Sequence, residues 1–124
     1  MRKKKDVVPL TLEERIILSI REKKGRNIIK IDLTELNNSI CEYFIISHGE
    51  SNTQVRAIAQ NIEDQIKKHL KQNAFHSEGY QNSQWVLLDY NTIVVHIFQE
   101  KIRNYYKLEE LWADGEVTVY PDEE

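Results

Sequence analysis

Two apolar segments separated by only two residues constrain the fold of this chain more than any other feature. Residues 85–90 (WVLLDY) and 93–98 (IVVHIF) are joined through Asn91 and Thr92. Their near-continuous apolar, β-branched and aromatic character is typical of strands that are covered on both faces. The sequence therefore predicts a central β-hairpin inside a layered α/β domain.

Helical periodicity is present on both sides of this hairpin. Thr11 to Glu14 has the spacing of a capping box and predicts a helix that ends near Gly25, a residue that tolerates a positive φ. Ser51 with Gln54 forms a second capping box. The longer helix that follows has apolar residues at helical spacing: Val55, Ile58, Ala59, Ile62, Ile66 and Leu70. A last helix of roughly three to four turns is predicted from a similar stripe: Phe98, Ile102, Tyr105, Leu108 and Trp112.

Further strands are expected at residues 27–33 and 43–47, and a short edge strand at 76–80. The predicted order is a helix, two strands, a long helix, two or three strands and a final helix. We therefore expect an α/β sandwich built on a mixed sheet of four to five strands with three flanking helices.

The chain of 124 residues has the size of one domain. We expect a flexible basic tail over residues 1–10, a folded domain over 11–113 and an acidic tail over 114–124. Cys41 is the only cysteine, so neither an internal disulfide nor a zinc cluster is expected. No apolar stretch approaches the roughly 18 to 20 residues that span a bilayer, and we expect a soluble, cytoplasmic protein without a membrane contact.

The charge of the chain bears on its partners. Lysine and arginine number 17 against 20 acidic residues, and four of the basic residues are Arg2, Lys3, Lys4 and Lys5. A phosphate-tracking surface normally needs clustered basic residues. The rest of the chain lacks that bias, which favours a basic protein over a nucleic acid as the partner, and no sequence-specific nucleic acid is expected.

Residues that could perform chemistry do not gather in the sequence. The four histidines are scattered, and none has a second histidine or cysteine at ligand spacing: His48, His69, His76 and His96. His96 lies inside an apolar strand, where a neutral histidine hydrogen-bonded to a neighbour is the common state. The acids do not form the strand pair that metal-dependent phosphoryl transfer needs. We expect no metal, no cofactor and no enzymatic activity.

A glycine and a serine between a strand and a helix, Gly49 and Ser51, invite comparison with a phosphate-binding loop. No lysine-serine pair and no second glycine follow, and Ser51 is explained as a helix N-cap. Capping is the favoured interpretation.

Aromatic residues are the more informative ones. Tyr105 and Trp112 share the apolar stripe of the last helix and are expected in the core. Trp85 and Tyr90 stand five residues apart on one strand and point to opposite faces, so both cannot fill the same side of one core. Tyr106 is out of phase with the stripe. Trp85, Tyr90 and Tyr106 are therefore candidates for a surface that contacts another protein.

Several motifs together resemble the ribosomal silencing factor family, RsfS or Iojap-like. The resemblance covers roughly residues 10 to 113. It rests on an ordered set of segments: EYFII (42–46), GES (49–51), QVRAIA (54–59), EG (78–79), WVLLDY (85–90), VVHIF (94–98) and RNYYKLEELW (103–112).

This resemblance implies a nucleotidyltransferase-like α/β fold without the catalytic carboxylates. It also implies binding to the fourteenth protein of the large ribosomal subunit, a steric block of small-subunit joining, and repression of translation under nutrient limitation. The family's partner-binding motif falls on Trp85, Asp89 and Tyr90, and His96 and Tyr106 match further family positions. Members can self-associate, so a homodimer of the free chain is a possible state.

The chain departs from the family pattern after Tyr90, where Asn91-Thr92 replaces the usual Gly-Asp. Asn tolerates a positive φ, so the turn can survive, although the second acid is absent. Glu42 replaces the Asp that usually precedes the Tyr-Phe pair of the family pattern. Two other functions remain open: an atypical nucleotidyltransferase-like enzyme that uses Gly49 and Ser51 at a phosphate, and direct RNA binding through residues 2 to 5.

Overall fold

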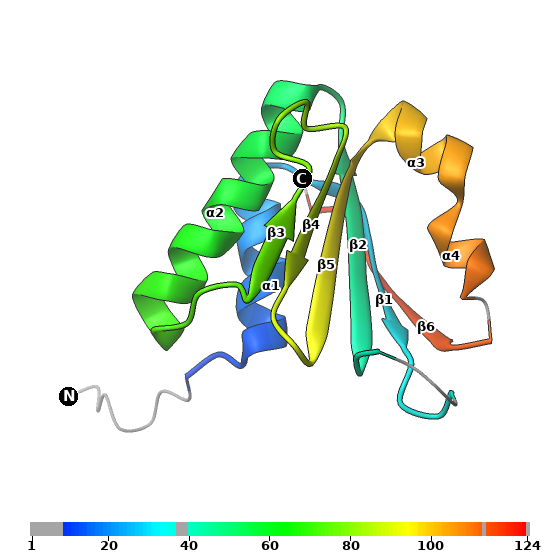
Figure 1. Cartoon of the computed structure of the whole chain (residues 1–124), viewed down its shortest axis with the longest axis horizontal. Coiled ribbons are helices and arrows are strands. Elements are labelled where there is room, and N and C mark those ends of the chain that lie inside the picture. Colours follow the sequence, from blue (N-terminus) through cyan, green and yellow to red (C-terminus); the bar gives the residue numbers. More distant parts are fainter. Residues whose placement is uncertain (1–8, 37–39, 113, 124) are drawn as a thin grey trace.

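A six-stranded mixed sheet lies between two layers of helices (Figure 1). The computed structural model describes residues 9–36, 40–112 and 114–123. Its elements are α1 (Leu12–Glu22), β1 (Arg26–Asp32), β2 (Tyr43–Gly49), α2 (Asn52–Leu70), β3 (His76–Glu78), β4 (Trp85–Asp89), β5 (Ile93–Gln99), α3 (Glu100–Tyr106), α4 (Leu108–Leu111) and β6 (Glu116–Tyr120). The strand order is β3-β4-β5-β2-β1-β6, and β2 and β5 form the parallel pair.

The hairpin of β4 and β5 is confirmed, as are the strands near residues 27–33 and 43–47 and the edge strand β3. The expected count of four to five strands is wrong. Residues 116–120, which were expected in the acidic tail, form β6 and pair with β1 along its length, from Ile28 opposite Tyr120 to Asp32 opposite Glu116. The segment 116–120 (EVTVY) has the alternation and the β-branched residues of a strand, which its acidic neighbours obscure in the sequence.

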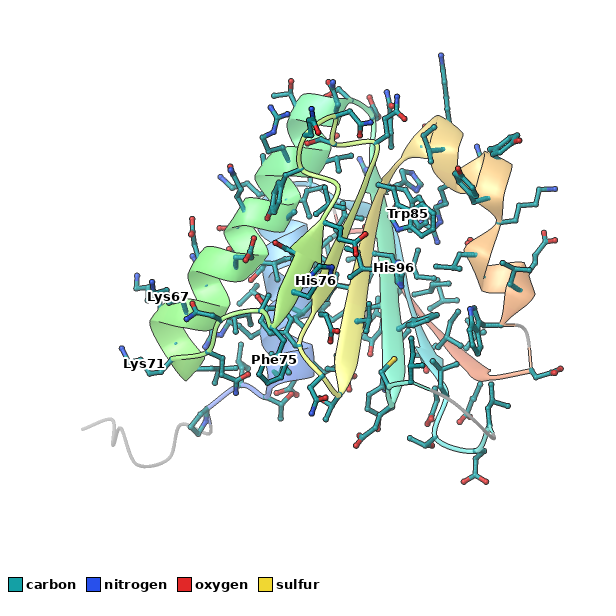
Figure 2. All side chains as sticks on the ribbon, in the orientation of Figure 1. Lys67, Lys71, Phe75, His76, Trp85 and His96 are labelled. Carbon is teal, nitrogen blue, oxygen red and sulfur yellow. The ribbon has the colours of Figure 1, made fainter. Side chains whose placement is uncertain are left out.

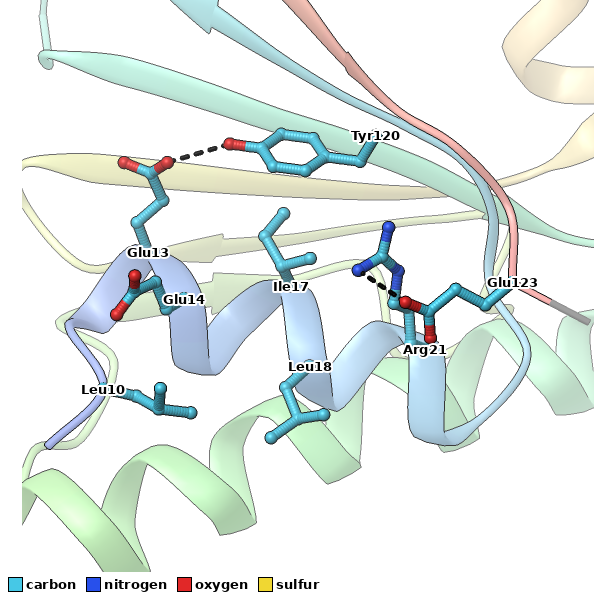
Figure 3. A pocket seen from close by; sticks show the side chains of 8 residues that line it. All are labelled: Leu10, Glu13, Glu14, Ile17, Leu18, Arg21, Tyr120 and Glu123. Carbon is cyan, nitrogen blue, oxygen red and sulfur yellow. Dashed lines mark hydrogen bonds and ion pairs between the residues drawn. The ribbon is translucent and has the colours of Figure 1, made fainter. Parts of the chain in front are cut away.

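Tyr120 connects the edge strand β6 to helix α1, which packs on one face of the sheet. Its hydroxyl donates to Glu13 Oε2 over 2.9 Å, and Arg21 forms an ion pair with Glu123 at 3.1 Å. A cavity of about 330 Å³ lies between these contacts (Figure 3). The C-terminal residues that the structure describes are therefore part of the fold.

The predicted start of α1 is confirmed, because Thr11 and Glu14 form the reciprocal hydrogen bonds of a capping box. Its end differs in detail. Lys24 adopts the positive φ of 64° that was expected at Gly25. Gly25 is needed for close packing instead, since a Cβ atom there would lie 2.3 Å from Ile20 Cγ2.

The start of α2 also agrees with the sequence, because the Ser51 side chain accepts from the Gln54 backbone N–H at 3.1 Å. The Gln54 side chain makes a different bond from the one expected, accepting from the Glu50 N–H. Its Nε2 donates to the carbonyls of Lys23 and Lys24, which joins the start of α2 to the end of α1.

The single last helix predicted from Phe98 to Trp112 is wrong. Phe98 lies in β5, and Lys107 interrupts the helix with a φ of 51°, which separates α3 from α4. Because the helical phase does not continue through this break, Tyr105 is 78% exposed rather than buried. Trp112 packs against Phe44, as expected for a core residue, with ring centroids 5.4 Å apart.

Each face of the sheet has its own core. The α1 and α2 layer covers one face, where the buried residues include Ile16, Ile20, Ile45, Ile58, Ile62, Val86, Leu88, Val95 and Ile97. The short helices α3 and α4 lie over the other face, where the buried residues include Ile29, Ile31, Phe44, Ile46, Val94, Phe98 and Leu108. Because α3 and α4 are shorter than α1 and α2, side chains on the α3 side of the sheet remain available to a partner.

Candidate protein-binding surface

Strand β4 presents alternate side chains to the two faces of the sheet. Val86 and Leu88 are buried under α2, whereas Trp85, Leu87 and Asp89 point to the α3 side and are only partly buried. Trp85 and Leu87 line a hollow of about 230 Å³ together with Glu78 and Gly79. The α3 and α4 helices therefore leave the β4 part of this face open.

Trp85 is held in place by three neighbours. Its indole Nε1 donates to Nδ1 of His96 over 3.0 Å. The indole stacks on Phe98, with ring centroids 4.7 Å apart, and lies 5.1 Å from the ring of Tyr106. Figure 2 shows Trp85 and His96 on the α3 side of the sheet. A large apolar ring is thus ordered before any partner arrives.

His96 lies beneath Trp85 and is 4% exposed. Desolvation lowers its pKa to about 4, so the ring is neutral at pH 7. Nδ1 accepts the indole N–H, which places the ring proton on Nε2, an atom that has no hydrogen-bond partner among the described residues. The expectation of a neutral, hydrogen-bonded histidine is confirmed, and His96 positions Trp85 from below the surface.

Tyr106 extends the exposed aromatic area. It is 49% exposed, and its ring lies edge-on to that of Tyr105 with centroids 5.2 Å apart. Tyr105 and Leu87 were missed as surface residues, although Leu87 stands two residues from Trp85 and shares its face of the strand. We call Trp85, Leu87, Asp89, Tyr105 and Tyr106 the aromatic surface.

Asp89 lies at the opposite end of β4 from Trp85. Its Oδ1 accepts from the Asn91 N–H at 2.7 Å, which stabilises the turn of the hairpin. Asn91 has the positive φ expected of it, 76°. One oxygen of the Asp89 carboxylate therefore accepts a hydrogen bond within the Asn91-Thr92 turn, the segment that departs from the family pattern.

Tyr90 does not lie on this surface. It is 4% exposed and belongs to the core under α1 and α2, so the expectation of an exposed Tyr90 is wrong. The opposite orientations of Trp85 and Tyr90 are confirmed: Tyr90 is buried in the core, and Trp85 lies partly exposed on the other face. Burial raises the pKa of the Tyr90 phenol, and its hydroxyl has no partner among the described residues.

Arg103, which sequence reasoning did not single out, fastens α3 to the sheet. It is 6% exposed and donates to the Asn27 carbonyl at 2.8 Å, His48 Nδ1 at 3.0 Å and Glu109 Oε2 at 3.1 Å. Desolvation and the charge of Arg103 lower the pKa of His48. The bond to Glu109 crosses the break at Lys107, so Arg103 fixes the positions of both short helices and of the tyrosines they carry.

The alternative site at Gly49 and Ser51 has a structural explanation. Ser51 is the N-cap of α2, and a Cβ atom on Gly49 would lie 3.1 Å from the Gln54 side chain. Within residues 9–36, 40–112 and 114–123, no three His, Cys, Asp or Glu side chains are grouped as metal ligands. Cys41 is buried, and desolvation raises the pKa of its thiol to about 11. Over the same residues, no helix has the length and apolar character needed to cross a membrane.

Comparison with known proteins identifies the family. A family model described as ribosomal silencing factor during starvation matches residues 10–124, which include β6. Ribosomal silencing factor RsfS of Bacillus subtilis is 39% identical over 94 residues, covering 76% of this chain and 78% of that protein.

Solved structures agree with this match. A crystal structure of a protein from Chromobacterium violaceum is similar with a TM-score of 0.78 and 32% identity, covering 82% of this chain and 83% of that one. A second, from Bacillus halodurans, has a TM-score of 0.73 and 31% identity, covering 82% and 92%. This chain belongs to the ribosomal silencing factor family, RsfS.

Proposed function

We propose that this chain binds the large ribosomal subunit through its fourteenth ribosomal protein and thereby blocks joining of the small subunit. Translation is then repressed under nutrient limitation, in the cytoplasm where ribosomes work. Membership of the silencing factor family supports this function. The observation that carries the proposed site is the ordered, partly exposed Trp85 indole on the open part of the α3 face.

The aromatic surface has the composition of a protein interface. Tryptophan and tyrosine are enriched among the residues that dominate binding energy, and a stable interface buries about 1,200 to 2,000 Å². Because His96 and Phe98 already hold the indole, little side-chain entropy is lost when a partner covers it. Glu78 lines the hollow beside the indole and Asp89 stands at the far end of β4, and both carboxylates suit a cationic partner.

The inhibition requires no chemical step. A folded domain bound to the face of the large subunit that meets the small subunit occupies the space that joining requires. Binding affinity and lifetime, rather than turnover, then determine the extent of repression.

Replacing the central ring tests this proposal. We expect Trp85→Ala to lose most co-sedimentation with isolated large subunits, since truncation of such an anchor costs about 2 kcal/mol or more, or roughly thirtyfold in affinity. Tyr90→Phe is the matched control, because it keeps a buried ring on the other face and should bind normally. Circular dichroism checks that both variants are folded.

Binding by a folded Trp85→Ala variant at the level of the unaltered chain would remove the aromatic surface from the interface. Preferential binding to isolated small subunits would contradict the proposed partner. An assay of subunit joining then measures whether bound chain prevents 70S formation, as the steric mechanism requires.

A further inference from the structure

A second exposed surface lies away from the aromatic surface, at the C-terminal end of α2. Residues 65–76 (QIKKHLKQNAFH) contain three lysines and two histidines and no acidic residue. Eight of their side chains are exposed, and five of these define what we call the basic surface: Lys67, Lys68, His69, Lys71 and Phe75. Figure 2 shows Lys67 on the last turn of α2 and Lys71 at its C-cap, with Phe75 in the segment that leads into β3.

The lysines of this surface keep their charges available. Among the described residues, none of Lys67, Lys68 and Lys71 has an acidic oxygen within 4.0 Å of its ammonium group. Lys71 Nζ donates only to the backbone carbonyl of Lys68, at 3.3 Å. Asp64 stands one turn earlier on α2, and Glu63 beside it accepts from the Tyr80 hydroxyl. Glu63 and Asp64 line a hollow together with Lys67, but within the described part of the chain neither forms an ion pair with a lysine of this surface.

The same positive charges act on His69. Desolvation and the positive charges of Arg15, Lys68 and Lys71 lower its pKa, and Glu22 opposes them. Arg15 belongs to α1, so basic side chains from two helices act on the same point. The net charge of the whole chain is −3, which makes this concentration of positive charge a local feature.

Phe75 gives this surface an aromatic component. The ring is 76% exposed, although its backbone N–H is bonded to the Asp89 carbonyl at 2.8 Å. The ring follows Lys71 by four residues along the chain. Proteins combine exposed aromatic rings with lysines to stack unpaired bases and contact phosphates of the same strand. The exposed amides of Gln72 and Asn73 add hydrogen-bonding groups between the lysines and the ring.

We infer that the basic surface binds RNA, with Lys67, Lys68 and Lys71 on the phosphate backbone and Phe75 against an unpaired base. This contact is additional to the protein contact proposed above and does not depend on it. The lone exposed ring does not form the broad apolar face of a membrane-binding helix. An acidic protein would use the lysines but leave the stacking surface of Phe75 without a function.

Fluorescence anisotropy with a labelled RNA hairpin that has an unpaired loop tests the inference on the full chain. We expect Lys67→Gln combined with Lys68→Gln to weaken binding about tenfold at low salt. The slope of log Kd against log salt concentration should fall by about two. The matched control is Lys23→Gln combined with Lys24→Gln, an exposed lysine pair at the end of α1, which should leave binding unchanged.

Phe75→Leu tests the stacking part separately. It should weaken hairpin binding about fivefold or more without changing the salt slope, because it removes the aromatic plane but no charge. Trp85→Ala should bind the hairpin normally, which separates this inference from the proposed function. All the substituted side chains are at least partly exposed, and thermal unfolding verifies that the variants are folded.

Three results would overturn the inference: no saturable binding to the hairpin, equal losses in the two lysine pairs, or a Phe75→Leu variant that binds like the unaltered chain. Equal affinity for polyglutamate would identify an acidic protein as the better partner. Flotation with vesicles containing phosphatidylglycerol, without hairpin binding, would identify a membrane surface instead.

Discussion

The two faces of the sheet are covered in different ways, and the candidate function lies on the less covered face. On one side, α1 and the 19-residue α2 lie against the strands, and their apolar stripes are buried. On the other side, α3 and α4 have seven and four residues, with a break at Lys107 between them. The face that α1 and α2 cover forms the larger core, whereas the shorter helices α3 and α4 leave Trp85 partly exposed on the other face.

Two adjacent leucines of β4 give the largest expected difference between the two faces of the sheet. Leu88 is fully buried under α2, and Leu87 is partly exposed on the other face. We expect Leu88→Ala to lower the free energy of unfolding by about 2 to 5 kcal/mol, because it leaves a cavity. Leu87→Ala should cost less than half as much and should weaken large-subunit binding. Urea unfolding measures both, and equal losses would show that the two faces are packed alike.

A second test uses pH to probe the α3 side of the sheet, where His48 and His96 are both buried. The pKa of His96 is lowered from 6.5 to about 4, so unfolded chains bind its proton more readily than folded ones. Its contribution to stability is therefore complete above about pH 6.5 and is lost as the pH falls toward 4. The loss is on the order of 3 kcal/mol.

Unfolding by urea at pH 7.0 and pH 4.5 measures this loss. In His96→Asn, whose amide oxygen can accept the indole N–H, the acid-dependent loss at pH 4.5 should be smaller than in the unaltered chain by most of that amount. His69→Asn changes an exposed histidine whose pKa is also lowered, but it should reduce the acid-dependent loss by less than His96→Asn does, because His69 is exposed and His96 is buried. An unchanged acid response in His96→Asn would show that His96 is not desolvated.

The smallest expected effect concerns the break between α3 and α4. Lys107 has a φ of 51°, a conformation that glycine adopts without steric cost. We expect Lys107→Gly to raise the free energy of unfolding by about 0.5 to 1 kcal/mol. Lys101→Gly, in the first turn of α3, should lower it instead, because glycine is a poor helix former. Thermal unfolding compares the two, and destabilisation by Lys107→Gly would mean that its side chain supports the fold.

The local signals in the sequence were sufficient for much of the fold. The capping residues Thr11 and Ser51, the stripe of α2 and the hairpin around Asn91 all depend on interactions within a few residues. The break at Lys107 was missed because the apolar spacing continues across it. Strand β6 was missed because its pairing with β1 joins residues that are far apart in the sequence.

The candidate site was predicted in part. Trp85 and Tyr106 lie together on an exposed face, and Asp89 shares that face at the far end of β4. Tyr90 was misplaced because strand alternation shows that two side chains oppose one another without showing which face is open. The exposed fraction of Tyr105 could not be obtained from helical phase, since the phase ends at Lys107.

The α/β class, the family resemblance and the opposite orientations of Trp85 and Tyr90 follow from residue order and short-range periodicity. Long-range packing decided that Tyr90 enters the core and that His96 accepts the Trp85 indole N–H. It also decided that the C-terminal segment completes the sheet. Each of these outcomes depends on which distant segments cover a given face, and burial by distant segments is not encoded in any single stretch of residues.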